Sequence, residues 1–469
     1  MLASDDEPSM TAADSATPAA ARRAAWDVLT AYLVADPSRA RLGTRKRPFP
    51  PPDLEPRDRA LARDIAEGSV ARIATLDAIL ADVARGRTPR PQGLRAALLL
   101  SAWQLFYAPD LPAHSIVHAG VALARRAAGE GGAKFANALL RKLAATRDPA
   151  AWLEASRAQG DELDWLAIWH SLPREILERW MQDFGREATF AIAEASNSRP
   201  PTSLRITAQS TPDEVAASLR AAGCEVREGL AARNLLVTRP HANLIETQAF
   251  KDGHFAIQDT TQIEVVDLVV DQARRFAERS GRGELRILDL CAAPGTKTCA
   301  IAEALPNARV FAYDSASDRL AQLLVEAGRL GLDASATGRV QRLETAAALE
   351  AAAAAEPFDL VLVDAPCSNS GVLARRPEAR WRLSANTIER HAQAQVALVL
   401  EALRYVRAGS PIVFATCSIE FEENEGVARD LAATGRVRVV SSERSLPETA
   451  LRDGGGVTVF ERLDDPGGT

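Results

Sequence analysis

Two cysteines occupy matching places in the chain, where they could serve as catalytic nucleophiles. Cys367 lies in Asp364-Ala-Pro-Cys-Ser368 and Cys417 lies in Ala415-Thr-Cys-Ser418, and each motif directly follows a short apolar run. A lone cysteine is most often a small buried hydrophobe. Two cysteines that each end a predicted strand and precede a serine favour chemistry instead, because a thiolate is a strong nucleophile.

One reaction that needs such a thiolate is methylation of a cytosine at carbon 5. That carbon is too weak a nucleophile to accept a methyl group directly, so an enzyme must first add a nucleophile to carbon 6. After the methyl group is transferred to C5, a base removes the C5 proton and the thiolate leaves. Asp364, three residues before one cysteine, could hold the edge of a flipped base and share a proton with it.

A small-residue turn suggests a second ligand. Residues 285–298 predict a strand that runs into Cys291-Ala-Ala-Pro-Gly295 and then a helix beginning near Thr296. In a doubly wound sheet, ligands meet the carboxyl end of the first strand and the helix N-terminus at such a turn. Asp289 could fix the loop, and the small side chains permit close approach. The spacing fits neither GxGxxG nor GxxxxGK[ST], so dinucleotide and triphosphate binding are disfavoured.

An acidic residue follows the next predicted strand. Asp314 lies about twenty residues past the turn, where a carboxylate can accept hydrogen bonds from ribose hydroxyls. Together with the turn, it suggests a cofactor that contains adenosine. Asp314 could equally be only a helix cap in Asp314-Ser-Ala-Ser317.

The elements that must position these residues follow from the apolar pattern. From about residue 263, the predicted strands 286–290, 309–313, 359–363 and 411–415 alternate with helices, which predicts a parallel, doubly wound sheet. Helical periodicity covers 19–143 and 150–195, and short strands return in 203–258. We therefore predict a multidomain protein with a disordered tail (1–18), an all-α domain (19–147), a helical connector with a small α+β module (148–262), an α/β Rossmann-like domain (263–463) and a short tail (464–469).

The amino-acid composition narrows the class of protein further. The 469 residues contain no apolar run of membrane-spanning length and no secretory signal at the start, so a cytoplasmic protein is expected. Five cysteines without CxxC spacing argue against disulfides and against a structural zinc site. The formal net charge of −6 means that nucleic acid would need a local basic surface.

The best basic candidate lies between residues 372 and 392, where five arginines outnumber two glutamates. Arginines interleaved with an aromatic residue are typical of a loop that grips phosphates and stacks a base. A solvated helical face with one core tryptophan would look the same. The predicted RNA contacts are Arg375, Arg376, Arg380, Trp381 and Arg382.

Taken together, these motifs resemble the Sun/nucleolar-protein family of RNA cytosine-C5 methyltransferases. The N-terminal part is similar to the NusB-like domain of the bacterial small-subunit rRNA enzyme of that family. The motifs that carry the resemblance are Leu288–Thr298, Asp364–Ser368 with Gly371, Thr416–Ile419 with Glu422–Glu425, and, in the N-terminal part, Asp58–Ala62, Leu94–Leu98, Gln104–Phe106 and Phe135–Arg141.

The resemblance implies a role for each matching residue. Cys417 is expected to attack C6, Cys367 to assist release of the methylated RNA, and Asp364 to sit between cofactor and base with Lys297 nearby. The implied cofactor is S-adenosyl-L-methionine, the implied partner is small-subunit rRNA, and a monomer without a metal is expected. The implied cofactor contacts are Cys291, Ala292, Ala293, Pro294, Gly295, Lys297, Asp314, Arg319, Glu344 and Asp364.

Some positions depart from the family pattern, and two other functions stay open. Thr296 replaces a usual glycine, and Glu344 stands where an aspartate usually contacts the adenine side of the cofactor. Such departures would suit a non-catalytic RNA-binding or ribosome-assembly factor. A DNA cytosine methyltransferase would use Cys367, not Cys417, as its nucleophile.

Overall fold

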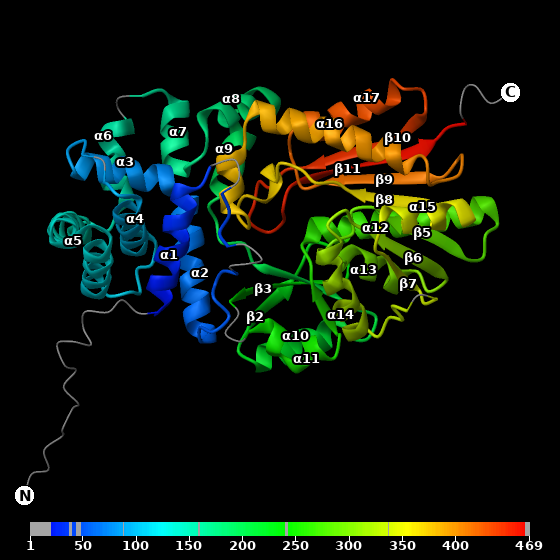
Figure 1. Cartoon of the computed structure of the whole chain (residues 1–469), viewed down its shortest axis with the longest axis horizontal. Helices are drawn as coiled ribbons and strands as arrows, with labels where there is room; N and C mark the ends of the chain where they lie inside the picture. Colours follow the sequence, from blue (N-terminus) through cyan, green and yellow to red (C-terminus); the bar gives the residue numbers. More distant parts are fainter. Residues whose placement is uncertain are drawn as a thin grey trace, which may run out of the picture. The chain divides into compact units, whose positions relative to one another are not determined.

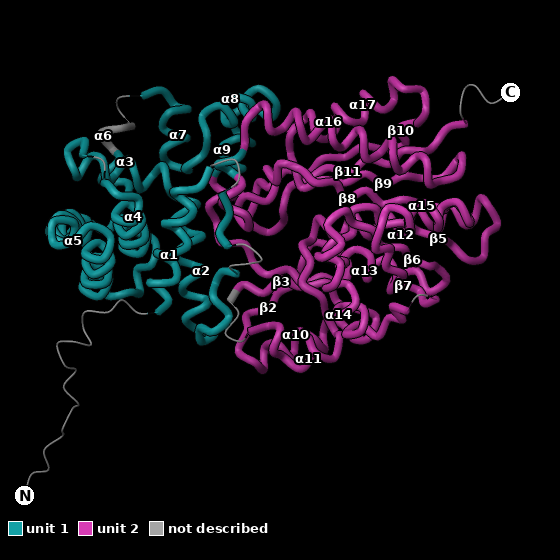
Figure 2. The backbone as a smooth tube through the Cα atoms, in the orientation of Figure 1, with its two compact units in different colours: residues 1–193, 380–382 teal, residues 194–379, 383–469 magenta. Residues whose placement is uncertain are grey.

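The computed structural model describes residues 20–36, 40–43, 48–87, 89–157, 160–239, 243–335 and 337–464. The predicted tail 1–18, and all but the first residue of the predicted tail 464–469, lie outside these ranges. The chain divides into two compact units, residues 1–193 with 380–382, and residues 194–379 with 383–469 (Figure 2).

The first unit is helical, as the periodicity predicts. Its central helix is apolar on nearly every side and is buried from Leu94 to Phe106, apart from single positions, as expected of a helix enclosed by others. Trp26 fixes its start by donating a hydrogen bond from Nε1 to the Gly93 carbonyl at 2.7 Å. The helices are α1 (Ala20–Val34), α2 (Pro56–Ala71), α3 (Ile73–Val83), α4 (Gln92–Tyr107), α5 (Ala113–Ala145), α6 (Pro149–Arg157), α7 (Glu162–His170), α8 (Arg174–Asp183) and α9 (Gly185–Ala195).

Three residues from much later in the chain, Arg380 to Arg382, belong to this helical unit. Arg380 is fully buried and donates to the backbone carbonyl of Ala71 at 2.8 Å. Trp381 Nε1 donates to the Val70 carbonyl at 2.9 Å, and Arg382 to the Ala40 carbonyl at 3.0 Å. These donors are directed at protein carbonyls, so they stabilise the helical unit, and the RNA contact of this triplet stays a prediction.

Replacing Arg380 with alanine should lower the thermal unfolding temperature of the helical unit, since buried carbonyls lose their donor at a cost of about 1–3 kcal/mol. The salt dependence of RNA affinity should not change. Arg376→Ala is the matched control, because Arg376 is exposed. Loss of RNA affinity in Arg380→Ala with full thermal stability would show that Arg380 contacts RNA after all.

The second unit begins with a small antiparallel sheet. Its strands are β1 (Thr202–Ile206), β2 (Glu225–Glu228), β3 (Asn234–Arg239) and β4 (Phe255–Ile257), in the order β2-β3-β1-β4. Helix α10 (Pro212–Ala221) starts at a capping box formed by Thr211 and Glu214, and α11 (Gln248–Lys251) is short. This is the predicted α+β module.

The remaining strands form one mixed, seven-stranded sheet. Its members are β5 (Leu285–Asp289), β6 (Ala308–Tyr313), β7 (Val340–Leu343), β8 (Leu360–Asp364), β9 (Pro411–Thr416), β10 (Val437–Ser445) and β11 (Gly455–Arg462), in the order β10-β11-β9-β8-β5-β6-β7. Strands β5 to β9 are parallel, and β10 and β11 are antiparallel. The predicted fold class is confirmed, but the sheet is not wholly parallel.

Helices cover both faces of this sheet (Figure 1). On one face α12 (Thr260–Ser280), α13 (Thr296–Ala304) and α14 (Ala321–Arg329) bury one core, and on the other α15 (Ala346–Ala355), α16 (Ala385–Ala402) and α17 (Val427–Ala432) bury a second. The cysteine motifs and the small-residue turn therefore leave the sheet at its carboxyl edge. In the ranges described above, no helix is long and apolar enough to cross a membrane.

Candidate active site

The two cysteines meet at the carboxyl edge of neighbouring strands. Strand β8 pairs with β9 so that Asp364 lies opposite Ala415, and each cysteine follows within three residues. Their Sγ atoms are 3.4 Å apart, within hydrogen-bonding distance for sulfur. Cys367 is buried, whereas Cys417 is partly exposed. A substrate can therefore reach Cys417 more easily than Cys367.

The surroundings give the two thiols different proton affinities. The hydrogen bond from Cys367 lowers the pKa of Cys417 below its usual range, although burial and Asp364 oppose this and the cations of Lys297 and Arg376 assist. The same hydrogen bond, together with burial, raises the pKa of Cys367 well above its usual range. Cys417 is thus the more acidic thiol of the pair and the one that ionises more readily.

Lys297 and Asp364 form a close ion pair beside the thiolate. Lys297 Nζ lies 2.5 Å from Asp364 Oδ2, and both side chains are largely buried. Burial lowers the pKa of Lys297, but the charge of Asp364 and its hydrogen bond outweigh burial, so the net shift is upward. Lys297 therefore stays protonated, which keeps a cation near Cys417.

The small-residue turn forms the wall of a cavity. The Asp289 side chain reaches this cavity and is 1 % exposed. Its Oδ2 accepts a hydrogen bond from the Thr298 hydroxyl at 2.7 Å, whereas its Oδ1 has no hydrogen-bond partner among the described residues. Burial raises the pKa of Asp289 to about 7. The cavity is lined by Ile257, Gln258, Asp259, Gln262, Asp289, Cys291, Ala292, Ala293, Pro294, Thr296, Lys297 and Asp364.

One observation indicates that the residues of this cavity fit S-adenosylmethionine. A buried carboxylate oxygen without a partner is costly unless a ligand donor or cation completes it. Asp289 Oδ1 is such an oxygen and lies where the ammonium group of an amino acid could approach. The neighbouring Ala292 and Ala293 leave room for close contact.

Gly295 holds the turn in a shape that other residues adopt poorly. Its φ is +108°, and an added Cβ would lie 2.6 Å from Leu323 Cδ1 and 3.0 Å from Leu323 Cα. Gly295→Ala should therefore destabilise the fold by about 1–3 kcal/mol and weaken cofactor binding. Urea unfolding and calorimetry measure the two effects.

Gly281→Ala provides the matched control, because Gly281 also has a positive φ, +68°, but open space where a Cβ would be added. It should show the cost of the backbone conformation alone. Equal stability losses in the two variants would contradict a role for the Leu323 contact.

The other predicted cofactor residues occupy the neighbouring strand ends. The Asp314 carboxylate accepts from the amides of Ala293 at 3.1 Å and Ala316 at 2.8 Å, and lies 3.3 Å from Arg319. Asp314 thus fixes the turn directly. Glu344 follows β7, is exposed, and pairs with Arg342 at 3.5 Å. Neither carboxylate lines the cavity described above, so their contacts with ribose and adenine stay predictions.

The predicted RNA contacts Arg375 and Arg376 differ in their surroundings. Arg375 donates from Nε to Asp453 at 2.9 Å and from Nη2 to Asp259 at 2.9 Å, so it ties three loops together. Burial and the charge of Asp259 raise the pKa of Asp453 to about 7, although Arg375 lowers it. Arg376 is exposed and donates to Asn369 Oδ1 at 3.2 Å. Of the five predicted residues, Arg376 is the one exposed beside the cysteines.

Sequence reasoning missed the residues that hold the two cysteine loops together. Ser368 and Ser418 both hydrogen-bond to Glu423, a fully buried carboxylate. Cys417 Sγ donates to Asn369 Oδ1 at 3.7 Å. The repeated Cys-Ser pair and the acidic run Glu422–Glu425 were the available signals. Nothing in the sequence showed that the acidic run turns back on both serines.

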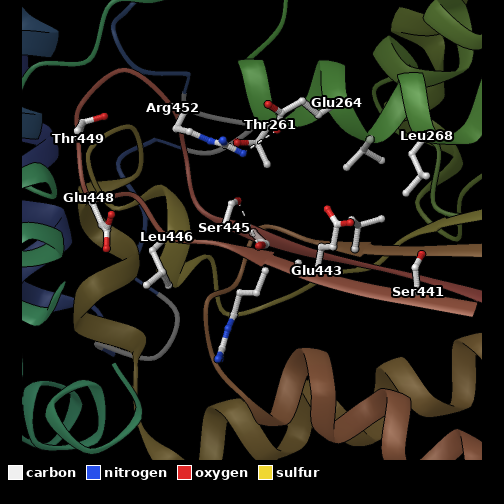
Figure 3. Close-up of a pocket in the computed structure, with 15 residues that line it drawn as sticks. Thr261, Glu264, Leu268, Ser441, Glu443, Ser445, Leu446, Glu448, Thr449 and Arg452 are labelled. Atoms are coloured by element: carbon white, nitrogen blue, oxygen red, sulfur yellow. Dashed lines mark hydrogen bonds and ion pairs between the residues drawn. The ribbon is translucent and has the colours of Figure 1, made fainter. Parts of the chain in front are cut away.

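A second cavity, of about 640 Å³, lies between α12 and the β10–β11 hairpin (Figure 3). Glu264, one of its lining residues, pairs with Arg452 at 2.7 Å. Neither Cys367 nor Cys417 lines either cavity, but the Lys297–Asp364 ion pair lines the smaller one.

Comparisons with known proteins agree with this geometry. Residues 280–455 match the sequence model of the family described as 16S rRNA methyltransferase RsmB/F. Residues 19–145 match that of the NusB family, and residues 172–242 match a ferredoxin-like domain described as Methyltr_RsmF/B-like.

Among curated relatives, the chain is 29 % identical to the ribosomal RNA small subunit methyltransferase B of Vibrio cholerae over 409 residues, covering 86 % of this chain and 87 % of that protein. It is 28 % identical to the probable ribosomal RNA small subunit methyltransferase B of Bacillus subtilis over 380 residues, covering 80 % of each.

Two solved structures share the fold. The crystal structure of PH0851 superposes with a TM-score of 0.72 at 22 % identity, covering 94 % of this chain and 98 % of that one. The crystal structure of NSun6 from Pyrococcus horikoshii with SFG superposes with a TM-score of 0.52 at 19 % identity, covering 62 % of this chain and 99 % of that one.

Proposed function

We infer that the chain is an RNA methyltransferase of the RsmB/F type, as its motifs predicted, and propose that it methylates carbon 5 of a cytosine in small-subunit rRNA. The observation that carries the proposal is the pair of cysteines 3.4 Å apart beside the cofactor turn. A site with a thiolate, a neighbouring thiol and a buried ion pair suits covalent activation of a pyrimidine.

S-adenosyl-L-methionine, when bound, supplies the methyl group. Asp289 and the Cys291–Gly295 turn would hold its methionine end, because Asp289 and most of the turn line the cavity and Asp289 Oδ1 has no hydrogen-bond partner among the described residues. Asp314 and Glu344 would lie toward its ribose and adenine. Lys297 and Asp364, which also line the cavity, would separate this group from the base.

The chain's own residues then divide the remaining work. The Cys417 thiolate forms a bond to C6, which moves an electron pair onto C5 so that C5 can accept the methyl group. Asp364, held by Lys297, is placed to hydrogen-bond the edge of the base during this attack. Removal of the C5 proton by a base returns its electron pair to the ring and breaks the bond between C6 and sulfur. Cys367 is placed to stabilise the departing thiolate by hydrogen bonding.

Bisulfite sequencing of small-subunit rRNA tests the proposal directly. A strain that lacks this gene should lose one methylated cytosine, and the wild-type gene should restore it. The purified chain should transfer labelled methyl groups to unmodified small-subunit rRNA. If no methylated position is lost and S-adenosylmethionine does not bind at millimolar concentration in calorimetry, a non-catalytic RNA-binding factor is the better description.

A further inference from the structure

A buried carboxylate lies directly behind the two cysteine loops. Glu423 belongs to a short π-helical segment, Glu422–Gly426, between β9 and α17, and is fully buried. π-helical turns are rare and often mark functional sites. The proposed reaction gives Glu423 no contact with base or cofactor.

The hydrogen bonds of Glu423 hold residues next to the cysteines and a residue of helix α16. Oε1 accepts from the Ser368 amide at 2.9 Å and from Gln395 Nε2 at 3.0 Å. Oε2 accepts from the Ser418 hydroxyl at 2.5 Å and from the Ser368 hydroxyl. One carboxylate therefore binds the residue that follows Cys367 and the residue that follows Cys417.

The hydrogen bonds around Glu423 have a defined direction. The hydroxyl groups of Ser368 and Ser418 both donate to its Oε2. The Ser418 oxygen is then free to accept from the Glu420 amide at 3.1 Å. Ser370, whose oxygen accepts from the Ile419 amide at 3.0 Å, lies 3.2 Å from Ser418 Oγ. Both cysteine loops thus share one ordered network.

Glu423 affects the cysteines through its charge in addition to its hydrogen bonds. Beyond the hydrogen bond with Cys417 and burial, the negative charge of Glu423 contributes to the raised pKa of Cys367. Cys367 consequently keeps its proton and can donate it toward Cys417 Sγ, 3.4 Å away.

We propose that Glu423 is a positioning residue, which holds the Cys367 and Cys417 loops so that the two Sγ atoms stay at hydrogen-bonding distance. The purpose of this positioning role depends on the proposed function. Its test rests on the thiols alone and needs neither RNA nor S-adenosylmethionine.

The test is the pH dependence of Cys417 alkylation by iodoacetamide in the full chain, followed by peptide mass spectrometry. In Glu423→Gln, an amide replaces an acceptor-only group, so at least one serine donor loses its partner and the loops separate. The alkylation midpoint of Cys417 should then move to higher pH, because the bond that stabilises the thiolate is weakened. Glu425→Gln is the matched control, since Glu425 lies on the same turn but pairs with Arg444 at 3.3 Å.

Two further variants keep the test decisive if Glu423→Gln does not fold. Ser418→Ala and Ser368→Ala each delete one hydroxyl donor and should each move the Cys417 midpoint upward by a smaller amount. An unchanged or lower midpoint in folded Glu423→Gln would overturn the proposal, as would unchanged midpoints in both serine variants. The unsubstituted chain could fail to methylate rRNA while Glu423→Gln still shows the expected upward shift of the Cys417 midpoint. Those results would disprove the proposed function and leave the positioning role standing.

Discussion

Replacing Cys417 with alanine should abolish methylation of small-subunit rRNA, with a loss of roughly 10⁴-fold or more in rate, as for other catalytic nucleophiles. Without the thiolate, C6 receives no nucleophile and C5 stays too weak to take a methyl group. The neighbouring Cys367 is a poor substitute, because its raised pKa leaves it protonated and it is buried. Transfer of labelled methyl groups to unmodified rRNA measures the loss.

Cys224→Ala serves as the control for this experiment. Cys224 is a buried free cysteine of the small α+β module, outside the seven-stranded sheet. Its removal should leave methylation unchanged. The assignment of the nucleophile would be wrong if Cys417→Ala still formed a covalent adduct with RNA while Cys367→Ala formed none. Those results would point to the DNA-methyltransferase arrangement, in which Cys367 attacks.

The meeting of the two cysteines could be predicted from sequence because it follows from local patterns. Each motif ends a short apolar run, and parallel strands deliver their carboxyl ends to one edge of a sheet. The pattern did not show that β8 and β9 are direct neighbours. The start of α13 at Thr296 was predicted for the same local reason, a small-residue turn that precedes a helical pattern.

The features that sequence reasoning missed depend on contacts between distant residues. The β10–β11 hairpin was overlooked because β10 is an exposed edge strand with polar residues, whereas β11 opens with a glycine pair that resembles a turn. The sequence did not show that Arg380 and Trp381 donate to protein carbonyls, because composition alone does not distinguish donors aimed at carbonyls from donors aimed at phosphates. The acidic run that contains Glu423 was visible in the sequence, but its partners were not, since two of them lie 28 and 55 residues away.

Replacing Cys367 with alanine should produce the opposite kind of defect, an enzyme that remains attached to its RNA. The Cys367 thiol lies 3.4 Å from Cys417 Sγ, close enough to stabilise the thiolate as its bond to C6 breaks. Loss of a positioned proton donor slows such a step by roughly 10²-fold or more. Methylated RNA linked to the protein should therefore accumulate as a slowly migrating band on a denaturing gel.

The same substitution removes the hydrogen bond that lowers the pKa of Cys417, so two effects compete in Cys367→Ala. At neutral pH fewer molecules carry the thiolate and the adduct forms more slowly. At alkaline pH the thiolate returns, whereas the missing donor still delays release. The adduct should thus increase with pH in Cys367→Ala and should disappear in the double variant that also carries Cys417→Ala. An adduct that persists in the double variant, or a single variant that turns over normally at alkaline pH, would contradict this division of roles between the two cysteines.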